Sequence, residues 1–289
     1  MSTVQTRPSP PAPTLSATDK KAEQSEDLLA TVERIGPLIR QHAAAAERER
    51  RLSREVMRAL AEAGLFRLLL PRSLGGLEVD PVTCSRIVEE VARYDSAAAW
   101  ALQAGNEGAW WAARLPEEGS NEVYERNPSA IMSAAFHPPQ QAVEVSGGYR
   151  ITGRGPLASN IHDAEWLFLT ALVMEGGRPR TANGMPEMIG VVLRASEAQI
   201  VDTWDSLGMR ATDSNDVVVE NAFVPATRTF PLLPDYEPTR HFRGPLYRFP
   251  ASGVAIFVVA PVPLAVARAA ISEVRELAQR KTALGFSKP

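Results

Sequence analysis

Three residue types that act together in catalysis lie close to one another in a short polar segment of this 289-residue chain. Ser159, His162 and Asp163 fall within residues 158–163, between two runs that alternate like strands. In a hydrolytic triad the histidine lies between the serine and the carboxylate. Neighbouring positions on one loop can hardly give that order, and the sequence has no G-x-S-x-G turn. A hydrolase is disfavoured, and the loop is either a site for other chemistry or a solvated turn.

A glycine pattern before this loop formally matches a dinucleotide-binding motif. Residues 153–158 read G-x-G-x-x-A. That motif binds a pyrophosphate only where a helix begins inside the glycine run and aims its amide groups at the phosphates. Pro156 removes one amide donor, and the flanking residues have the pattern of strands. We therefore expect no Rossmann-type nicotinamide site.

The histidines and tryptophans carry no strong signal of their own. The four histidines have no second histidine or cysteine at the spacing of metal ligands, so no metal site is predicted; they are His42, His137, His162 and His241. The tryptophans are suited to stacking on a planar ring, but large aromatic residues pack by default in a core. They are Trp100, Trp110, Trp111, Trp166 and Trp204.

The polar loop is held by a region in which apolar residues alternate with period two, which we place at 129–228 as a middle β-domain. Gly147-Gly148 separates two alternating runs and predicts a hairpin turn. The second run is expected to break at Gly155-Pro156. Short strands with Gly-, Pro- and Asn-rich turns predict a compact antiparallel barrel or sandwich. The expected strands are 130–135, 142–145, 148–152, 166–174, 188–193, 199–203 and 216–224.

Helical patterns precede this region, and we expect residues 26–128 to form an N-terminal helical domain. Residues 1–25 are rich in Pro, Ser and charge and are predicted to be disordered. The first helix is expected from Leu28, with Pro37 kinking or dividing it. The later helices have recognisable N-caps, which are Ser53, Asp80 followed by Pro81, and Asp95 followed by Ser96.

The C-terminal part is predicted to hold one amphipathic helix after a linker at 229–248. Residues 249–289 would form the first helix of an incomplete helical bundle, with the helix itself at about 264–280. The uncharged run 249–267 has the length of a membrane span, but three prolines interrupt it. We expect a segment made for a protein core, and a helix whose apolar face needs a partner.

Composition limits the class of function. The hydrophobic fraction is 45%, the charged fraction 22% and the net charge −3, which describes an ordinary globular chain of one large or two to three smaller domains. The negative charge argues against nucleic acid or an anionic membrane as a partner, because both need a positive field. The single cysteine, Cys84, excludes an internal disulfide framework and favours a cytoplasmic protein.

Three separate blocks, in order, resemble the acyl-CoA dehydrogenase superfamily over roughly residues 28–281. They are AEAGLFRLLLPRSLGGLEVDPVTCSRIVEEVARYDSAAAW, GGYRITGRGPLASNIHDAEW and DTWDSLGMRATDSNDVVVENAFVP. They look most like the branch of two-component monooxygenases that hydroxylate aromatic substrates with reduced flavin. The resemblance implies an α+β, acyl-CoA dehydrogenase-like fold: an N-terminal helical domain, a middle β-domain and a C-terminal four-helix bundle that builds a tetramer.

The resemblance also implies a flavin, FAD or FMN, between the β-domain and the C-terminal helices. Transferred residue by residue, Ser159 takes the place of the serine near flavin N5, with Ala158 and Asn160 beside it. Trp100 lies in the helix region that borders the substrate pocket. The second flavin-lining segment corresponds to Ser133, Ala134, Ala135 and Phe136. The family's catalytic carboxylate or histidine belongs to later helices, so no catalytic residue is assigned.

Several positions depart from the family pattern. Gly155 and Leu157 stand where aromatic residues are common, which predicts more open space beside the ring. Asn160 replaces a glycine and tolerates a positive φ. In the third block Ala211 and Asp213 replace two glycines, and Asp213 would put a negative charge near a cofactor phosphate.

The residues leave three hypotheses for function. The first is a flavin-dependent monooxygenase for a small aromatic substrate, served by a flavin reductase and assembled as a homo-oligomer. The second is an acyl-CoA dehydrogenase that passes a hydride from an acyl-CoA thioester to FAD. The third is a truncated, non-catalytic chain or scaffold that associates with a full-length homologue, because an incomplete bundle would expose an apolar face. A carboxylate base would favour dehydrogenation, and a histidine would favour oxygenation.

Overall fold

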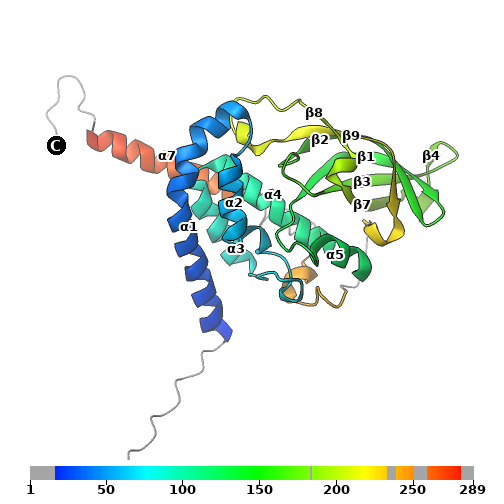
Figure 1. The fold of residues 1–289 in the computed structure, drawn as a ribbon, viewed down its shortest axis with the longest axis horizontal. Helices are drawn as coiled ribbons and strands as arrows, with labels where there is room; N and C mark the ends of the chain where they lie inside the picture. Colours follow the sequence, from blue (N-terminus) through cyan, green and yellow to red (C-terminus); the bar gives the residue numbers. More distant parts are fainter. Residues whose placement is uncertain (1–16, 183, 233–238, 250–258, 281–289) are drawn as a thin grey trace, which may run out of the picture.

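The computed structural model describes residues 17–182, 184–232, 239–249 and 259–280. Helices occupy one side of the molecule and a β-sheet the other, with α4 running between them (Figure 1). The helices are α1 (Ala17–Glu49), α2 (Arg54–Glu62), α3 (Pro81–Ala92), α4 (Ser96–Ala112), α5 (Glu117–Tyr124) and α7 (Pro261–Arg280). α4 contacts α3 on one side and the first strand of the sheet on the other. The predicted order of helices, sheet and helix is confirmed.

The predicted N-caps are confirmed. Ser53 accepts a hydrogen bond from the amide of Val56 at the start of α2. Asp80 accepts two amide hydrogen bonds at the start of α3, and Asp95 accepts one from the amide of Ala98 at the start of α4. These side chains satisfy N–H groups that have no partner inside the helix, which is why short-range sequence signals located the helices well.

The first helix begins earlier than the sequence predicted. α1 starts at Ala17, so residues 17–25 are helical and the predicted disordered tail is wrong there; residues 1–16 lie outside the described residues. Tertiary contacts explain the difference. Gln24 donates to the carbonyl of Leu77 over 3.2 Å, and Ser25, which is 3% exposed, accepts from Arg86. The helix is also not divided at Pro37.

The sheet is rich in antiparallel pairs but is not closed. Its strand order is β10-β7-β3-β1-β2-β9-β8, with β4 paired to β3. β1 and β3 are parallel, and the other pairs are antiparallel. The predicted β-domain is therefore present, but as an open sheet among the described residues. The strands are β1 (Met132–Val145), β2 (Gly148–Ala158), β3 (Trp166–Glu175), β4 (Arg178–Pro179), β7 (Met188–Arg194), β8 (Gln199–Val201), β9 (Asn215–Pro225) and β10 (Thr229–Pro231), beside a small pair β5 (Thr181–Ala182) and β6 (Met185–Pro186).

Two strands are longer than predicted. β1 joins the two expected segments into one strand, with an irregular register between Ala135 and Gln140. β2 does not break at Gly155-Pro156 but continues to Ala158, which pairs with Asn215 of β9. Pro156 falls within a register shift of the β2–β9 ladder, where a missing amide donor costs little. The predicted hairpin turn is confirmed, with Gly147 at φ 82°.

The C-terminal helix is confirmed, although it starts at Pro261 rather than Leu264. Val262 and Ala265 are buried, whereas Ile271 and Val274 are more than half exposed, and the end of α7 projects away from the other helices (Figure 1). Residues 250–258, inside the apolar run considered as a membrane span, lie outside the described residues. Among the residues that are described, no helix has the length and apolar character to cross a membrane. β10 adds a strand to the sheet beyond the expected boundary at 228.

α4 is locked between the two sides of the molecule by a glycine and an asparagine. A Cβ on Gly108 would lie 2.4 Å from the Cβ of Met132, so only glycine lets the helix approach β1 this closely. On the opposite side, fully buried Asn106 accepts from the amide of Leu68 at 2.9 Å and donates to the carbonyl of Leu65 at 2.8 Å. These contacts fix the position of α4 against the sheet.

Replacing Asn106 by alanine is expected to lower the free energy of unfolding by about 3 kcal/mol, because the buried amide of Leu68 and carbonyl of Leu65 lose their partners at about 1–3 kcal/mol each. Urea denaturation measures the change. Asn121→Ala, at a partly exposed position of α5, is the control and should stay within about 0.5 kcal/mol of the wild type. Equal losses in the two variants would contradict this role for Asn106.

Candidate functional site

The hydroxyl of Ser159 is the meeting point of three parts of the chain. Trp100 of α4 donates its indole N–H to Ser159 Oγ over 2.9 Å. Ser214, in the segment before β9, shares a hydrogen bond with the same oxygen at 2.8 Å. Ser133 of β1 donates to the backbone carbonyl of Ser159 at 2.7 Å. The structure thus brings together Trp100, Ser133 and Ser159, which lie far apart in the sequence and were predicted to share one site.

Asn160 pins the same loop to α4. Its side-chain amide donates to the carbonyl of Ala101 at 2.7 Å, and its backbone N–H donates to the carbonyl of Thr212 at 2.9 Å. Its φ is 59°, in the left-handed region that asparagine tolerates better than most residues. The expectation of a positive φ at Asn160 is confirmed, and its side chain gives the loop an anchor that glycine cannot.

His162 pairs with Asp213 rather than with its neighbour Asp163. Asp213 lies 2.7 Å from His162 Nδ1, and it accepts from the backbone N–H of His162 and from the side-chain amide of Asn215. Asp163 instead binds Arg51, in the segment between α1 and α2, at 2.6 Å. The carboxylate of Asp213 is 3% exposed, so its charge is held inside the loop by these donors. No serine, histidine and carboxylate form a triad among the described residues.

Two hollows meet at this loop. The first, which we call the α4 hollow, has a volume of about 380 Å³ and lies between α4, β1 and the end of β2. Its walls include Trp100, Trp111, Phe136 and Leu157. The second, the Trp204 hollow, has about 260 Å³ and continues from the same Trp100, Leu157 and Ser159 toward Trp204 and Met209. Ser159 therefore faces two predominantly apolar spaces at once.

The predicted flavin-lining residues divide into a surface layer and a supporting layer. Those that line the α4 hollow are Ala134, Phe136 and Ser159, together with Trp100. Buried behind them are Ser133, Ala135, Ala158 and Asn160. The open space predicted at Gly155 is absent, because a Cβ there would lie 2.7 Å from that of Ala135. Leu157, in contrast, is 59% exposed with φ 61° and separates the two hollows.

The sequence reasoning missed Glu107, which lines the α4 hollow. Its Oε1 accepts from the indole N–H of Trp111 at 2.9 Å. Burial raises the pKa of the Glu107 carboxyl, and the hydrogen bond from Trp111 offsets part of that rise. A signal was present, because Glu107 is the one charged residue in the 17-residue helix α4, among alanines, glycines and tryptophans.

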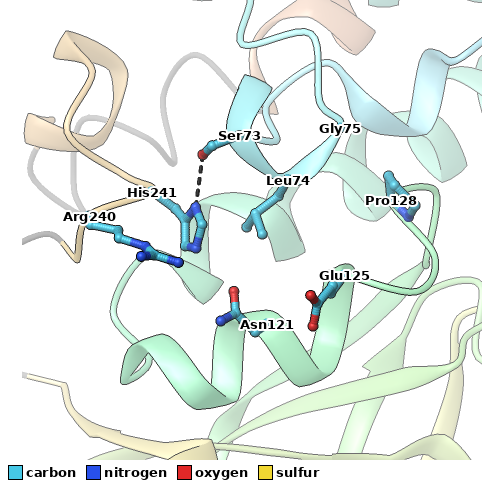
Figure 2. Close-up of a pocket in the computed structure, with 8 residues that line it drawn as sticks. All are labelled: Ser73, Leu74, Gly75, Asn121, Glu125, Pro128, Arg240 and His241. Atoms are coloured by element: carbon cyan, nitrogen blue, oxygen red, sulfur yellow. Dashed lines mark hydrogen bonds between the residues drawn. The ribbon is translucent and has the colours of Figure 1, made fainter.

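A hollow of about 400 Å³ elsewhere is lined by polar side chains, including Asn121, Glu125 and Arg240 (Figure 2). His241 Nδ1 lies 2.9 Å from the hydroxyl of Ser73 there. It contains none of the residues predicted for the site. The described residues also contain no cluster of three or more histidine, cysteine or acidic side chains suited to a metal ion.

Comparisons with known proteins identify relatives of this chain. The family model for the acyl-CoA dehydrogenase N-terminal domain matches residues 23–126. The chain is 33% identical over 232 residues to indole-3-acetate monooxygenase from Pseudomonas putida, covering 80% of this chain and 57% of that protein. It is 31% identical to the flavin-dependent monooxygenase oxygenase subunit HsaA from Mycobacterium tuberculosis, covering 73% of this chain and 52% of that protein. The chain thus spans little more than half the length of these relatives.

Solved structures lead to the same family. XiaF from Streptomyces sp., in complex with FADH2 and glycerol, superposes with a TM-score of 0.83 at 29% identity, covering 94% of this chain and 68% of that one. The 3-HSA hydroxylase from Rhodococcus sp. RHA1 superposes with a TM-score of 0.81 at 25% identity, covering 90% and 67%. The fold predicted by the resemblance is confirmed.

Replacing Asp213 by asparagine is expected to loosen residues 159–163. The new side-chain NH2 group would face N–H groups of His162 and Asn215, whose hydrogen bonds the carboxylate accepts. A loss of about 1–3 kcal/mol corresponds to amide exchange about 5- to 150-fold faster in this segment, measured by hydrogen–deuterium exchange. Asp202→Asn, which removes an exposed partner of Arg50, is the control and should leave the segment unchanged. Unchanged exchange in D213N would show that Asp213 does not hold the loop.

Proposed function

We propose that this chain, which belongs to the acyl-CoA dehydrogenase superfamily by its N-terminal domain and its fold, forms the flavin- and substrate-binding part of a flavin-dependent monooxygenase for small aromatic substrates. The observation that carries the proposal is the hydroxyl of Ser159, held by Trp100 at the junction of two aromatic-walled hollows. The relatives are named as monooxygenases, which favours oxygenation over the acyl-CoA dehydrogenase alternative.

The residues present fit a flavin ring. Such a ring is flat and apolar on its faces and polar along one edge, so it needs apolar walls and a few fixed hydrogen-bonding groups. Ala134, Phe136 and Leu157 supply apolar walls, and Ser159 supplies a hydroxyl between them. Ser214 and Thr212 continue from Ser159 as a chain of hydroxyls at 2.8 and 2.7 Å. Because Thr212 also donates to the carbonyl of Met209 at 2.9 Å, the chain of hydroxyls runs from Ser159 toward that carbonyl and leaves the oxygen of Ser159 as a hydrogen-bond acceptor for a ligand.

The side chains around the α4 hollow then have separate roles. A reduced flavin, when bound, supplies the electrons that activate dioxygen for hydroxylation. Ser159 would hold the polar edge of the ring, and Trp100 orients Ser159 through its indole N–H. The side chains of Trp111 and Phe136, whose ring centroids lie 5.6 Å apart, would keep water from the reacting groups. Trp111 also stacks on Phe168 at 5.0 Å, which makes this wall rigid.

The proposal extends to assembly and partners. A separate flavin reductase would supply the reduced flavin, since the relative HsaA is named as an oxygenase subunit. Association as a homotetramer would cover the apolar side chains of α7 that are 54–65% exposed, which are Leu264, Ile271, Val274 and Leu277. The single cysteine, Cys84, is buried and allows no internal disulfide, which favours the cytoplasm. The domains would be 26–128, 129–228 extended by β10, and the helix α7.

Purified chain titrated with FMN and with FAD is expected to show the absorbance band of bound oxidised flavin, and the better-bound flavin identifies the cofactor. Ser159→Ala should weaken that binding about tenfold, the equivalent of one hydrogen bond of about 1.4 kcal/mol. The affinity is measured by equilibrium dialysis, with size-exclusion chromatography beside it to give the oligomeric state.

Ser73→Ala, in the hollow of Figure 2, is the matched control and should bind flavin like the wild type. Absence of flavin binding in a folded wild-type chain would refute the proposal and favour the non-catalytic scaffold. Equal affinities in S159A and the wild type would remove Ser159 from the cofactor site.

A further inference from the structure

Glu107 is placed unlike the other acidic side chains that contact the protein interior. Asp80 and Asp95 cap helices, and Asp213 accepts hydrogen bonds inside its loop. Glu107 instead lies in the middle of α4 and lines the α4 hollow, where it is the one carboxyl among the described lining residues. The side chain of Glu107 is partly exposed, so a ligand in the hollow can contact its carboxyl directly.

The carboxyl of Glu107 is held in place through one of its two oxygens. Trp111 donates to Oε1, and Trp111 is itself fixed by its stack on Phe168. Among the described residues no hydrogen bond reaches Oε2 and no cation pairs with the group. The carboxyl is thus oriented by one oxygen and can accept a hydrogen bond through the other. A fixed acceptor in an apolar cavity is the arrangement that gives a binding site its selectivity.

We propose that Glu107 selects aromatic ligands that carry a hydrogen-bond donor, such as an ammonium, amine or hydroxyl group, and rejects aromatic carboxylates. This inference rests on the proposed function and adds that the aromatic substrate lies at the Glu107 end of the α4 hollow, beside the flavin ring held at Ser159. A donor on the ligand pairs with Oε2, and a cationic donor also supplies the counter-charge that the hollow lacks. A ligand carboxylate placed there meets a like charge.

The size of the hollow agrees with such a ligand. Its volume of about 380 Å³ falls in the usual range for small-molecule pockets, about 300–1,000 Å³. Trp100, Trp111 and Phe136 provide aromatic faces for a planar ring. Burial raises the pKa of the Glu107 carboxyl, and a donor from the ligand would offset the cost of the buried charge.

The test compares ligands that share one ring and differ in charge. Tryptamine, tryptophol and indole-3-acetate carry an ammonium, a hydroxyl and a carboxylate on the same indole. Isothermal titration calorimetry of the wild type at about pH 9, chosen on the alkaline side because the pKa of the Glu107 carboxyl is raised, is expected to give at least about tenfold tighter binding of tryptamine than of indole-3-acetate. Tryptophol should fall between them.

Two variants assign the selectivity to Glu107. Glu107→Gln keeps an oxygen acceptor for Trp111 and removes the charge, so it should fold and bring the tryptamine-to-acetate affinity ratio close to one. Glu118→Gln removes the same charge from an exposed position of α5 and should keep the wild-type ratio. Thermal unfolding of each variant verifies the fold, and the wild-type ligand series is itself decisive should E107Q be unstable.

Three results would overturn the inference: equal ratios in the wild type and E107Q, no binding of any of the ligands to the folded wild type, or a loss of flavin affinity in E107Q as large as its loss of tryptamine affinity. The last would assign Glu107 to the cofactor instead. The outcome is separable from that of the proposed function. A chain that shows the ligand pattern but binds no flavin keeps the selectivity of Glu107 and refutes the monooxygenase proposal. A chain that binds flavin, but whose tryptamine-to-acetate affinity ratio is the same in E107Q as in the wild type, keeps the monooxygenase proposal and refutes the selectivity of Glu107.

Discussion

The close approach of α4 to the sheet is the constraint on which the candidate site depends. Gly108 permits contact with Met132, and Asn106 ties the opposite side of the helix to residues 65–69. With α4 fixed from both sides, the indole of Trp100 reaches Ser159 and the carbonyl of Ala101 reaches Asn160. A shift of one ångström in the helix would break both contacts, because hydrogen bonds tolerate little change in distance.

The loop after β2 is held from the other side by the segment before β9. Asp213 binds His162, and the carbonyl of Thr212 accepts from the amide of Asn160. Two departures from the family pattern therefore act together. Asn160 and Asp213 stand in place of glycines, at φ 59° and 52°, and their side chains bind the neighbouring segment. These two positions have less backbone conformational freedom than glycine would have, and their side chains add hydrogen bonds that hold the loop.

Local signals in the sequence predicted the local parts of the structure. Helix starts at Ser53, Asp80 and Asp95 follow from capping, and the hairpin follows from Gly147. The long β1, the unbroken β2 and the early start of α1 depend on partners elsewhere in the chain, which periodicity does not contain. The site residues were placed by family resemblance. Their hydrogen bonds, and the position of Glu107 against the hollow, required the fold.

Glu107 differs from the other polar side chains of the site in its hydrogen-bond partners. Ser133, Ser159, Asn160 and Asp213 are nearly inaccessible to solvent, and each has partners from another segment. Those groups stabilise the scaffold, since an unpaired buried polar group would cost more than its hydrogen bond contributes. Glu107 has one oxygen bound by Trp111, and its side chain lines a hollow with aromatic walls. Gln103 and Tyr124 also have buried polar atoms without a partner among the described residues. Glu107 differs from them because it lines the hollow, where a ligand with a donor group can pair with its second oxygen.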